Sequence, residues 1–396
     1  MNGAVQQKRK NKALVVTSRN VHYTIVRPVI EELRRKDWKI TALKTERIWE
    51  KVEKLLSMTT KKRSLEYFYV KPPPRRAKKI NWYVYNLIAK FISVLMKVFK
   101  IEKPNIILVL TDSSPPCTIA VLVGRFANIP SLLLLHVGMI GCNYECPKFL
   151  VDKIAVTGEF AEDILIKRDV DKNRLVVTGR PTYDALVRAE EHFEKDEICR
   201  RLGLDQTRRI IVYTTENLPP SESEGMVYAI CKAVKEFSGL QFVIKIHPSE
   251  LDLSMYQRVT KDIGVDALIT RDANIYEVLY VSDTVITGFS ATALDAMMLD
   301  KPVITVNFTG LEDPLPFAES GAAIGVYEEK NLIPAIKMAL YDEGAREKLK
   351  EAREKFVHEH SYKKDGKSTE RVIKLIEQMV QKLPNNLHST ICTLVF

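Results

Sequence analysis

The stretch at residues 283–297 reads DTVITGFSATALDAM. Its first part is a short β-branched run, Gly288 follows where a tight turn is needed, and a helix is predicted from Ser290. A strand, a turn and a helix in this order form the repeating unit of a parallel α/β sheet. Ligands of such sheets bind beyond the carboxyl ends of the strands, so this turn is a candidate binding site.

The same rhythm of apolar runs and helical segments fills both halves of the chain. The runs are continuous in Val, Ile and Leu, which is typical of strands covered on both faces. We therefore expect an α/β protein with two parallel-sheet domains that face each other across a cleft. The predicted strands are residues 13–17, 38–43, 106–110, 131–135 and 153–157 in the first half, and residues 209–213, 242–246, 267–269, 284–286 and 302–306 in the second.

A chain of 396 residues is long enough for two such domains. We place an N-terminal, acceptor-binding domain at residues 1–179 and a C-terminal, nucleotide-donor domain at residues 180–360. A terminal helix at residues 361–383 is predicted to cross back to the first domain, and residues 384–396 form a tail.

The composition favours an ordinary globular protein that acts on anionic ligands. Its residues are 46% hydrophobic and 28% charged, and the net charge is +10. The basic runs lack interleaved aromatic residues and recognition motifs, so we do not expect nucleic acid as a partner. The six cysteines are scattered without a CxxC pair, and Cys142 and Cys146 near His136 lack a fourth ligand at metal-site spacing. We expect no metal, no disulfide framework and no cofactor.

No secretory signal and no apolar run long enough to span a bilayer is evident, so a cytoplasmic protein is expected. One helix predicted within residues 83–100 has a narrow polar stripe and a broad apolar face. We interpret it as a buried crossover helix. The alternative is a helix lying on a membrane surface, because the basic run RRAKK precedes it; residues 75–100 would then contact the inner face of the membrane.

Three loops in the first half carry candidate site residues. Ser18 and Arg19 follow the first strand and are candidates for a phosphate or acceptor contact, although a plain helix cap is an equal alternative. Asp112 lies in a loop before two prolines and is either a catalytic base or a turn residue. His136 ends an apolar run before a glycine, and it is either a catalytic acid–base group or a core histidine.

Two loops in the second half are candidates for the donor. The loop of Ser18 and Arg19 in the first half lacks the GxGxxG fingerprint, so NAD is not expected. Lys245 and His247 share one face at a strand end that Pro248 terminates. The turn within residues 283–297 offers free amide groups, hydroxyls and a carboxylate for a diphosphate and a sugar or ribose hydroxyl. Its candidate donor contacts are Gly288, Phe289, Ser290, Ala291, Thr292 and Asp295.

Residues 105–380 resemble the superfamily of GT-B transferases and UDP-N-acetylglucosamine 2-epimerases. The resemblance rests on an ordered set of motifs: VTGEFAEDIL, RLVVTGRPTYDAL, FVIKIHPSE, DTVITGFSATALDAMMLDKPVI and DGKSTERVIKLI. It implies a GT-B-like fold of two Rossmann-like domains. The HPSE and TGFSATALDAM segments are similar to the glycerophosphotransferase and capsule-polysaccharide transferase branch. In that branch His247 and residues 290–292 would contact the donor diphosphate, and His136 would correspond to the histidine of the N-terminal domain.

The epimerase branch is similar in HVG at His136, in VVTGRPTYDAL and in DAMMLDKPVITV. That branch usually carries HVEAG, an acidic loop and an SGG-EE segment, whose carboxylates are mostly missing here; Glu145 is a nearby candidate. We therefore expect a transferase that moves a glycosyl or glycerophosphate-type group from a nucleotide-activated donor to a surface-glycan or lipid-linked acceptor. The alternatives are an epimerase-like enzyme and a non-catalytic nucleotide-sugar-binding protein.

Overall fold

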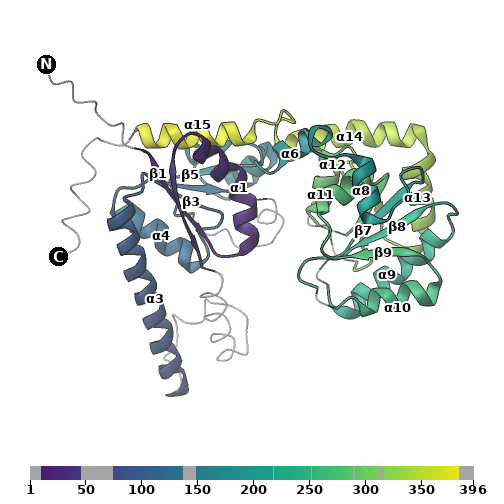
Figure 1. Cartoon of the computed structure of the whole chain (residues 1–396), viewed down its shortest axis with the longest axis horizontal. Coiled ribbons are helices and arrows are strands. Elements are labelled where there is room, and N and C mark those ends of the chain that lie inside the picture. Colours follow the sequence, from purple (N-terminus) through teal and green to yellow (C-terminus); the bar gives the residue numbers. More distant parts are fainter. Residues whose placement is uncertain are drawn as a thin grey trace.

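The computed structural model describes residues 10–45, 75–136, 149–216, 218–250, 252–288, 290–310, 312–313 and 315–382. Figure 1 shows two α/β lobes, with helices α14 (Glu343–Ser361) and α15 (Ser368–Gln381) running along one side of both. Each lobe contains one six-stranded sheet in which every pair of neighbouring strands is parallel. The predicted fold class is therefore confirmed.

The sheet of the first lobe has the strand order β2-β1-β3-β4-β5-β6. Alternate residues along its strands pack on opposite faces. One face is covered by α1 (Asn20–Arg35) and α15, and the other by α3 (Arg75–Glu102), α4 (Pro115–Phe126) and α5 (Glu159–Lys167). The strands are β1 (Lys12–Thr17), β2 (Lys39–Lys44), β3 (Ile106–Val109), β4 (Ser131–Leu134), β5 (Lys153–Val156) and β6 (Leu175–Val177).

The sheet of the second lobe has the order β12-β11-β10-β7-β8-β9. Helices α9 (Pro220–Lys235), α10 (Ser254–Ile263) and α13 (Leu332–Tyr341) cover one face, and α8 (Lys195–Leu202), α11 (Ile275–Val281) and α12 (Thr292–Met298) the other. The strands are β7 (Ile210–Thr214), β8 (Gln241–Lys245), β9 (Ala267–Thr270), β10 (Thr284–Thr287), β11 (Val303–Val306) and β12 (Ile324–Val326).

The strand order reverses once in each sheet, between β1 and β3 in the first lobe and between β7 and β10 in the second. Loops that leave two strands on either side of such a switch point diverge and leave room for a ligand. The fold therefore directs attention to the loops after β1 and β3, and to those after β7 and β10.

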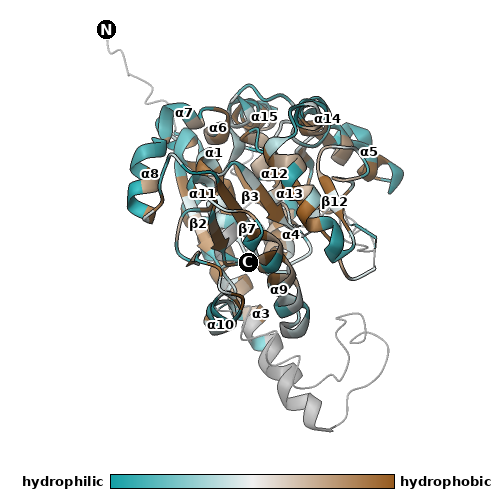
Figure 2. Cartoon of the chain, turned by 90° about the vertical axis from the view of Figure 1, so that its right-hand side faces the viewer, coloured by the Kyte–Doolittle hydropathy of each residue, from teal (hydrophilic) through white to brown (hydrophobic). Residues whose placement is uncertain are grey.

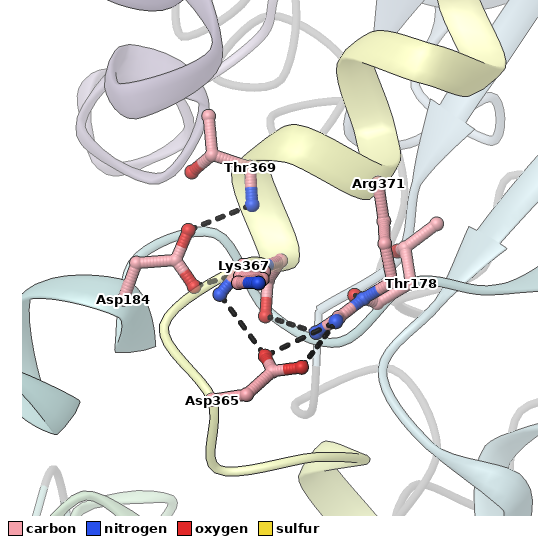
Figure 3. A network of polar contacts seen from close by, with 7 residues as sticks. Thr178, Asp184, Asp365, Lys367, Thr369 and Arg371 are labelled. Carbon is pink, nitrogen blue, oxygen red and sulfur yellow. Dashed lines mark hydrogen bonds and ion pairs between the residues drawn. The ribbon is translucent and has the colours of Figure 1, made fainter.

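The chain passes between the lobes twice, and the two passages are bonded to each other (Figure 3). The first passage leads from β6 to the short helices α6 (Tyr183–Val187) and α7 (Ala189–His192), and the second leads from α14 to α15. The carboxylate of Asp184 accepts hydrogen bonds from the amides of Ser368 at 2.8 Å and Thr369 at 2.7 Å. Arg371 donates to the carbonyl of Thr178 at 2.7 Å and pairs with Asp365.

Figure 2 shows apolar strands enclosed by helices with polar outer faces, and Figure 1 shows α3 extending beyond the first lobe. The prediction of a buried crossover helix is wrong for the part of α3 whose side chains are described. Leu95 and Phe99 are buried, but Val94 is 51% and Ile101 72% exposed. One side of the helix packs on the first lobe, where Phe91 and Val98 are also partly buried. Ile92, like Val94 and Ile101, is exposed. No helix among the described residues is long and apolar enough to span a bilayer.

Candidate functional site

The loop after β8 holds His247 in a network of hydrogen bonds. Its backbone amide donates to Oγ1 of Thr215 at 2.8 Å, and Nδ1 of its ring lies 2.6 Å from Oγ of Ser249. Oγ1 of Thr215 in turn donates to Glu250 at 2.5 Å, and the hydroxyl of Tyr256 donates to the same carboxylate. Partial loss of hydration lowers the pKa of His247. The network fixes the loop and leaves His247 exposed at the end of the strand.

The loop after β10 approaches the same edge. Gly288 is buried, and a Cβ atom there would lie 2.4 Å from Oε2 of Glu216, so a larger residue would require the side chain of Glu216 to shift. Oγ of Ser290 lies 2.9 Å from Oγ1 of Thr292 and accepts from the amide of Thr292 at 3.2 Å. Ala291 is partly buried, and Phe289 lies outside the described residues.

Strand register shows how the two loops are related. Thr287 of β10 pairs with Thr214 of β7, which pairs with Lys245 of β8. The loops of His247 and Gly288 therefore leave the sheet two strands apart, about 10 Å, and both touch the segment of Thr215 and Glu216 between them. This segment follows β7 at the switch point, and it was not predicted from the sequence as part of the site. Its position between two candidate loops was not visible before the strand order was known.

The predicted donor contact Lys245 has a different environment. Its side chain is buried, and its ammonium group donates to the carbonyls of Ile246 at 3.0 Å and Arg271 at 2.7 Å. Burial lowers the pKa of Lys245. Main-chain carbonyls thus take up two of its three hydrogen atoms, which ties the ends of β8 and β9 together.

Asp295, the last predicted donor contact, lies in a buried cluster with two residues from the first passage between the lobes. Nη1 of Arg180 lies 3.5 Å from Oδ1 of Asp295 and donates to the hydroxyl of Tyr183 at 2.7 Å. Burial raises the pKa of Asp295, and the charge of Arg180 opposes this effect. Nε of Arg180 is buried and has no hydrogen-bond partner among the described residues. Arg180 and Tyr183 belong to the motif RPTYDAL, but neither was predicted from the sequence as a site residue.

The first lobe brings its predicted residues Ser18, Arg19 and His136 together around a further histidine, His22. His136 lies just beyond β4, and its ring centroid is 5.7 Å from that of His22 on α1. Oγ of Ser18 lies 3.4 Å from Nδ1 of His22. Burial lowers the pKa of His136 to about 4, and the nearby charges of His22, Arg180 and Arg19 add to this shift. Arg180 therefore lies close enough to lower the pKa of His136 in the first lobe, and it also pairs with Asp295 of the second lobe.

Asp112, the second predicted catalytic residue, forms its side-chain hydrogen bond inside the first lobe. It is buried, and its Oδ2 accepts a hydrogen bond from the amide of Leu150 at 2.6 Å. Burial raises the pKa of Asp112. Hydrogen bonds from the amides of Leu150 and Val151 and the charge of Arg174 act in the opposite direction and lower this pKa. In the portion of the chain described, no contact joins Asp112 to His136. The carboxylate of Asp112 thus holds the segment before β5, and its role as a catalytic base stays a prediction.

Glu145, Cys142 and Cys146 lie outside the described residues. Within the described ranges, no three His, Cys, Asp or Glu side chains are grouped so that they could hold a metal ion.

The arrangement of the two lobes matches that of several solved structures. UDP-GlcNAc 2-epimerase from Neisseria meningitidis bound to UDP-GlcNAc aligns with a TM-score of 0.66 and 18% identity, over 93% of this chain and 100% of that chain. The epimerase from Methanocaldococcus jannaschii aligns with a TM-score of 0.62 and 15% identity, over 93% and 99%. The wall teichoic acid polymerase TagF, H444N variant, aligns with a TM-score of 0.59 and 14% identity, over 94% and 90%.

These likenesses show that the fold is GT-B. A search of curated proteins gave no match. The family model of CDP-Glycerol:Poly(glycerophosphate) glycerophosphotransferase matches residues 150–378, which is more than half of the chain. The chain belongs to this family, as the resemblance implied, and is therefore an enzyme of the class that transfers nucleotide-activated groups.

Proposed function

We propose that this enzyme transfers a glycerophosphate-type group from a CDP-activated alcohol to a hydroxyl group of a glycan or lipid-linked acceptor. The observation that carries this proposal is the family match, because its range contains the whole second lobe with the His247 and Gly288 loops. It also contains both passages between the lobes. The choice of glycerophosphate over a glycosyl group rests on the same match.

The second lobe provides the donor side of the reaction. A leaving nucleoside monophosphate develops negative charge, which hydrogen-bond donors and cations stabilise when they are already in place. Such groups are His247, the hydroxyls of Ser290 and Thr292, and the Nε of Arg180, which is buried and has no hydrogen-bond partner among the described residues. Glu216 lies against Gly288, so a donor phosphate placed at this turn requires that carboxylate to move aside.

The first lobe provides the base. An acceptor hydroxyl forms a new P–O bond to the outer phosphorus of the donor and gives its proton to a ring nitrogen of His136. The bond between that phosphorus and the bridging oxygen breaks, and its electron pair leaves with the nucleoside monophosphate. A histidine with a pKa of about 4 is neutral at pH 7, as a base must be. The anionic donor raises this pKa on binding, because it offsets the charges of Arg19 and Arg180.

An epimerase remains the second candidate, because solved epimerases share the fold over 93% of this chain. The carboxylates expected of that branch are mostly absent, and the one nearby candidate, Glu145, lies outside the described residues. This favours transfer over epimerisation.

Incubation with CDP-glycerol or UDP-GlcNAc, with and without a polyol-phosphate or lipid-linked acceptor, separates the candidates. We expect CMP release from CDP-glycerol that depends on the acceptor, and at least a hundredfold loss in His136→Ala. Formation of an isomer or free sugar from UDP-GlcNAc without acceptor would establish epimerase chemistry instead. Thermal stabilisation by CDP-glycerol without any turnover would indicate a binding protein.

We also propose that α3 contacts an anionic lipid surface where such an acceptor is presented. Lys90, Val94, Lys97 and Ile101 are spaced by three to four residues, so they share one face of the helix, and all are exposed. Alternating cations and apolar side chains on one exposed face suit a surface of anionic lipids.

Co-sedimentation with phosphatidylglycerol vesicles tests this contact. We expect the wild-type protein to bind them, and the double variant Val94→Ser/Ile101→Ser to bind several-fold less because two apolar anchors are lost. Ile333→Ser/Met338→Ser removes two exposed apolar side chains from α13 in the second lobe and serves as the matched control. Equal binding by all three proteins would exclude α3 as the contact.

A further inference from the structure

His22 occupies a specific position next to the proposed base. It lies in the first turn of α1, directly after the loop that leaves β1. Both His22 and Ser18 are only 6% exposed, and Oγ of Ser18 lies 3.4 Å from Nδ1 of His22. The imidazole of His22 is therefore buried at the carboxyl edge of the parallel sheet. The hydroxyl of Ser18 restricts its orientation.

The two histidines reach each other from different strands. His22 follows β1 and His136 follows β4, and β3 separates these strands in the sheet. Their ring centroids are 5.7 Å apart at an interplanar angle of 47°. The rings therefore meet over the end of β3, on one side of the switch point of the first lobe. Ser18, Arg19 and His136 were predicted from the sequence as site residues, whereas His22 was not.

We propose that His22 is a positioning residue for His136: Ser18 holds the ring of His22, and this ring orients that of His136 and keeps it uncharged in the free enzyme. The inference rests on the proposed function, in which His136 accepts the proton of the acceptor hydroxyl. His22 itself takes no proton in that step, and the proton leaves His136 for water after the product departs.

The charges around His136 support this assignment. Among the described residues, His22 on α1, Arg19 at the start of α1 and Arg180 in the passage between the lobes face it, and each is or can become positive. Two imidazoles at this distance resist simultaneous protonation, so they titrate as a coupled pair. Burial is the largest cause of the low pKa of His136. Of the three charged neighbours, His22 lowers this pKa the most.

Histidine-selective NMR titration measures the coupling without any substrate. In His22→Gln, which keeps a side chain of similar length without a titratable ring, we expect the titration midpoint of His136 to rise by about 1 pH unit. It should stay below 6.5, because burial persists. Ser18→Ala, which frees the ring of His22, should broaden or shift the same signal. His358→Gln, at an exposed histidine of α14, should leave it unchanged.

In the transfer assay, His22→Gln should lower kcat about tenfold with little change in donor Kd, and the acidic limb of the kcat/KM profile should move to higher pH. An unchanged midpoint of His136 in folded His22→Gln overturns the inference. So do independent, uncoupled titration curves of the two histidines in the wild-type protein, should the variant fail to fold. If the wild-type enzyme transfers nothing but the coupling is found, the proposed function fails and the pairing of the histidines stands.

Discussion

At the scale of single residues, His360 shows how a buried imidazole ties α14 to the first lobe. Its ring stacks on Phe356 of α14 at 3.8 Å and lies 4.1 Å from the ring of Phe160 of α5. Gly158, just before α5, approaches the carbonyl of Glu359 so closely that a Cβ atom would lie 2.2 Å from it. Burial lowers the pKa of His360 to about 4. The packing thus requires a neutral ring.

The low pKa of His360 predicts that the protein loses stability at acidic pH because of this one residue. The folded pKa of about 4 lies below the value of 6.5 for an unfolded chain, so the unfolded state takes up a proton first as the pH falls. The stabilisation is complete above about pH 6.5 and is lost as the pH falls toward 4. We expect urea unfolding to show about 2 kcal/mol more destabilisation between pH 7.5 and pH 5 in the wild type than in His360→Phe. Parallel loss of stability in both proteins would contradict this account.

Residue types and positions made some of the site visible in the sequence. A histidine at the end of a strand and a glycine turn before a helix carry local signals, and His136, His247 and Gly288 lie where those signals placed them. Arg180 and Glu216 carry no such signal, because their importance comes from partners that are distant in the sequence: Asp295 for the first and Gly288 for the second.

At the scale of secondary structure, α15 depends on a cap from another part of the chain. Its own N-cap residue, Lys367, makes no side-chain cap, and Asp184 supplies the carboxylate instead (Figure 3). An anionic acceptor at a helix N-terminus satisfies free amides and complements the helix dipole. Because Asp184 is buried, water cannot replace it fully.

We therefore expect Asp184→Ala to destabilise the protein by about 2 kcal/mol in urea unfolding and to speed amide exchange in the first turn of α15. Asp342→Ala is the matched control, because Asp342 caps α14 through the amide of Ala345 at an exposed site. We expect it to cost at most about 1 kcal/mol. If both changes have equal effects, the joint between the two passages contributes nothing beyond an ordinary cap.

Elements were predictable where burial leaves a continuous apolar pattern. Ten strands lie within one or two residues of their predicted bounds, whereas β6 and β12, each of three residues, were not predicted because so short a run carries no period. Helix α3 was predicted as a helix but not as an exposed one. Its amphipathic pattern shows that one face is apolar, and it does not show whether protein or lipid covers that face.

At the scale of the whole molecule, the loops at the two switch points hold the predicted site residues Ser18, Arg19, Asp112, Gly288, Ser290 and Ala291, and Thr292 begins the helix that follows. The predicted residues His136, Lys245, His247 and Asp295 lie on other elements or loops. The GT-B fold and the family followed from an ordered set of motifs, because such a set reflects the order of strands as well as local chemistry. The bounds of the domains stay a prediction. The pairing of His22 with His136, and of Arg180 with Asp295, depends on contacts that only the folded chain defines.

In the proposed reaction, the loops of His247 and Gly288 together bind the diphosphate of a nucleotide-activated donor. Isothermal titration calorimetry of CDP-glycerol tests it most directly, with His247→Ala as the test and His192→Ala, at an exposed histidine of α7, as the control. We predict that His247→Ala weakens binding at least tenfold, about 1.4 kcal/mol, while His192→Ala binds like the wild type. Unchanged affinity in folded His247→Ala would contradict the account.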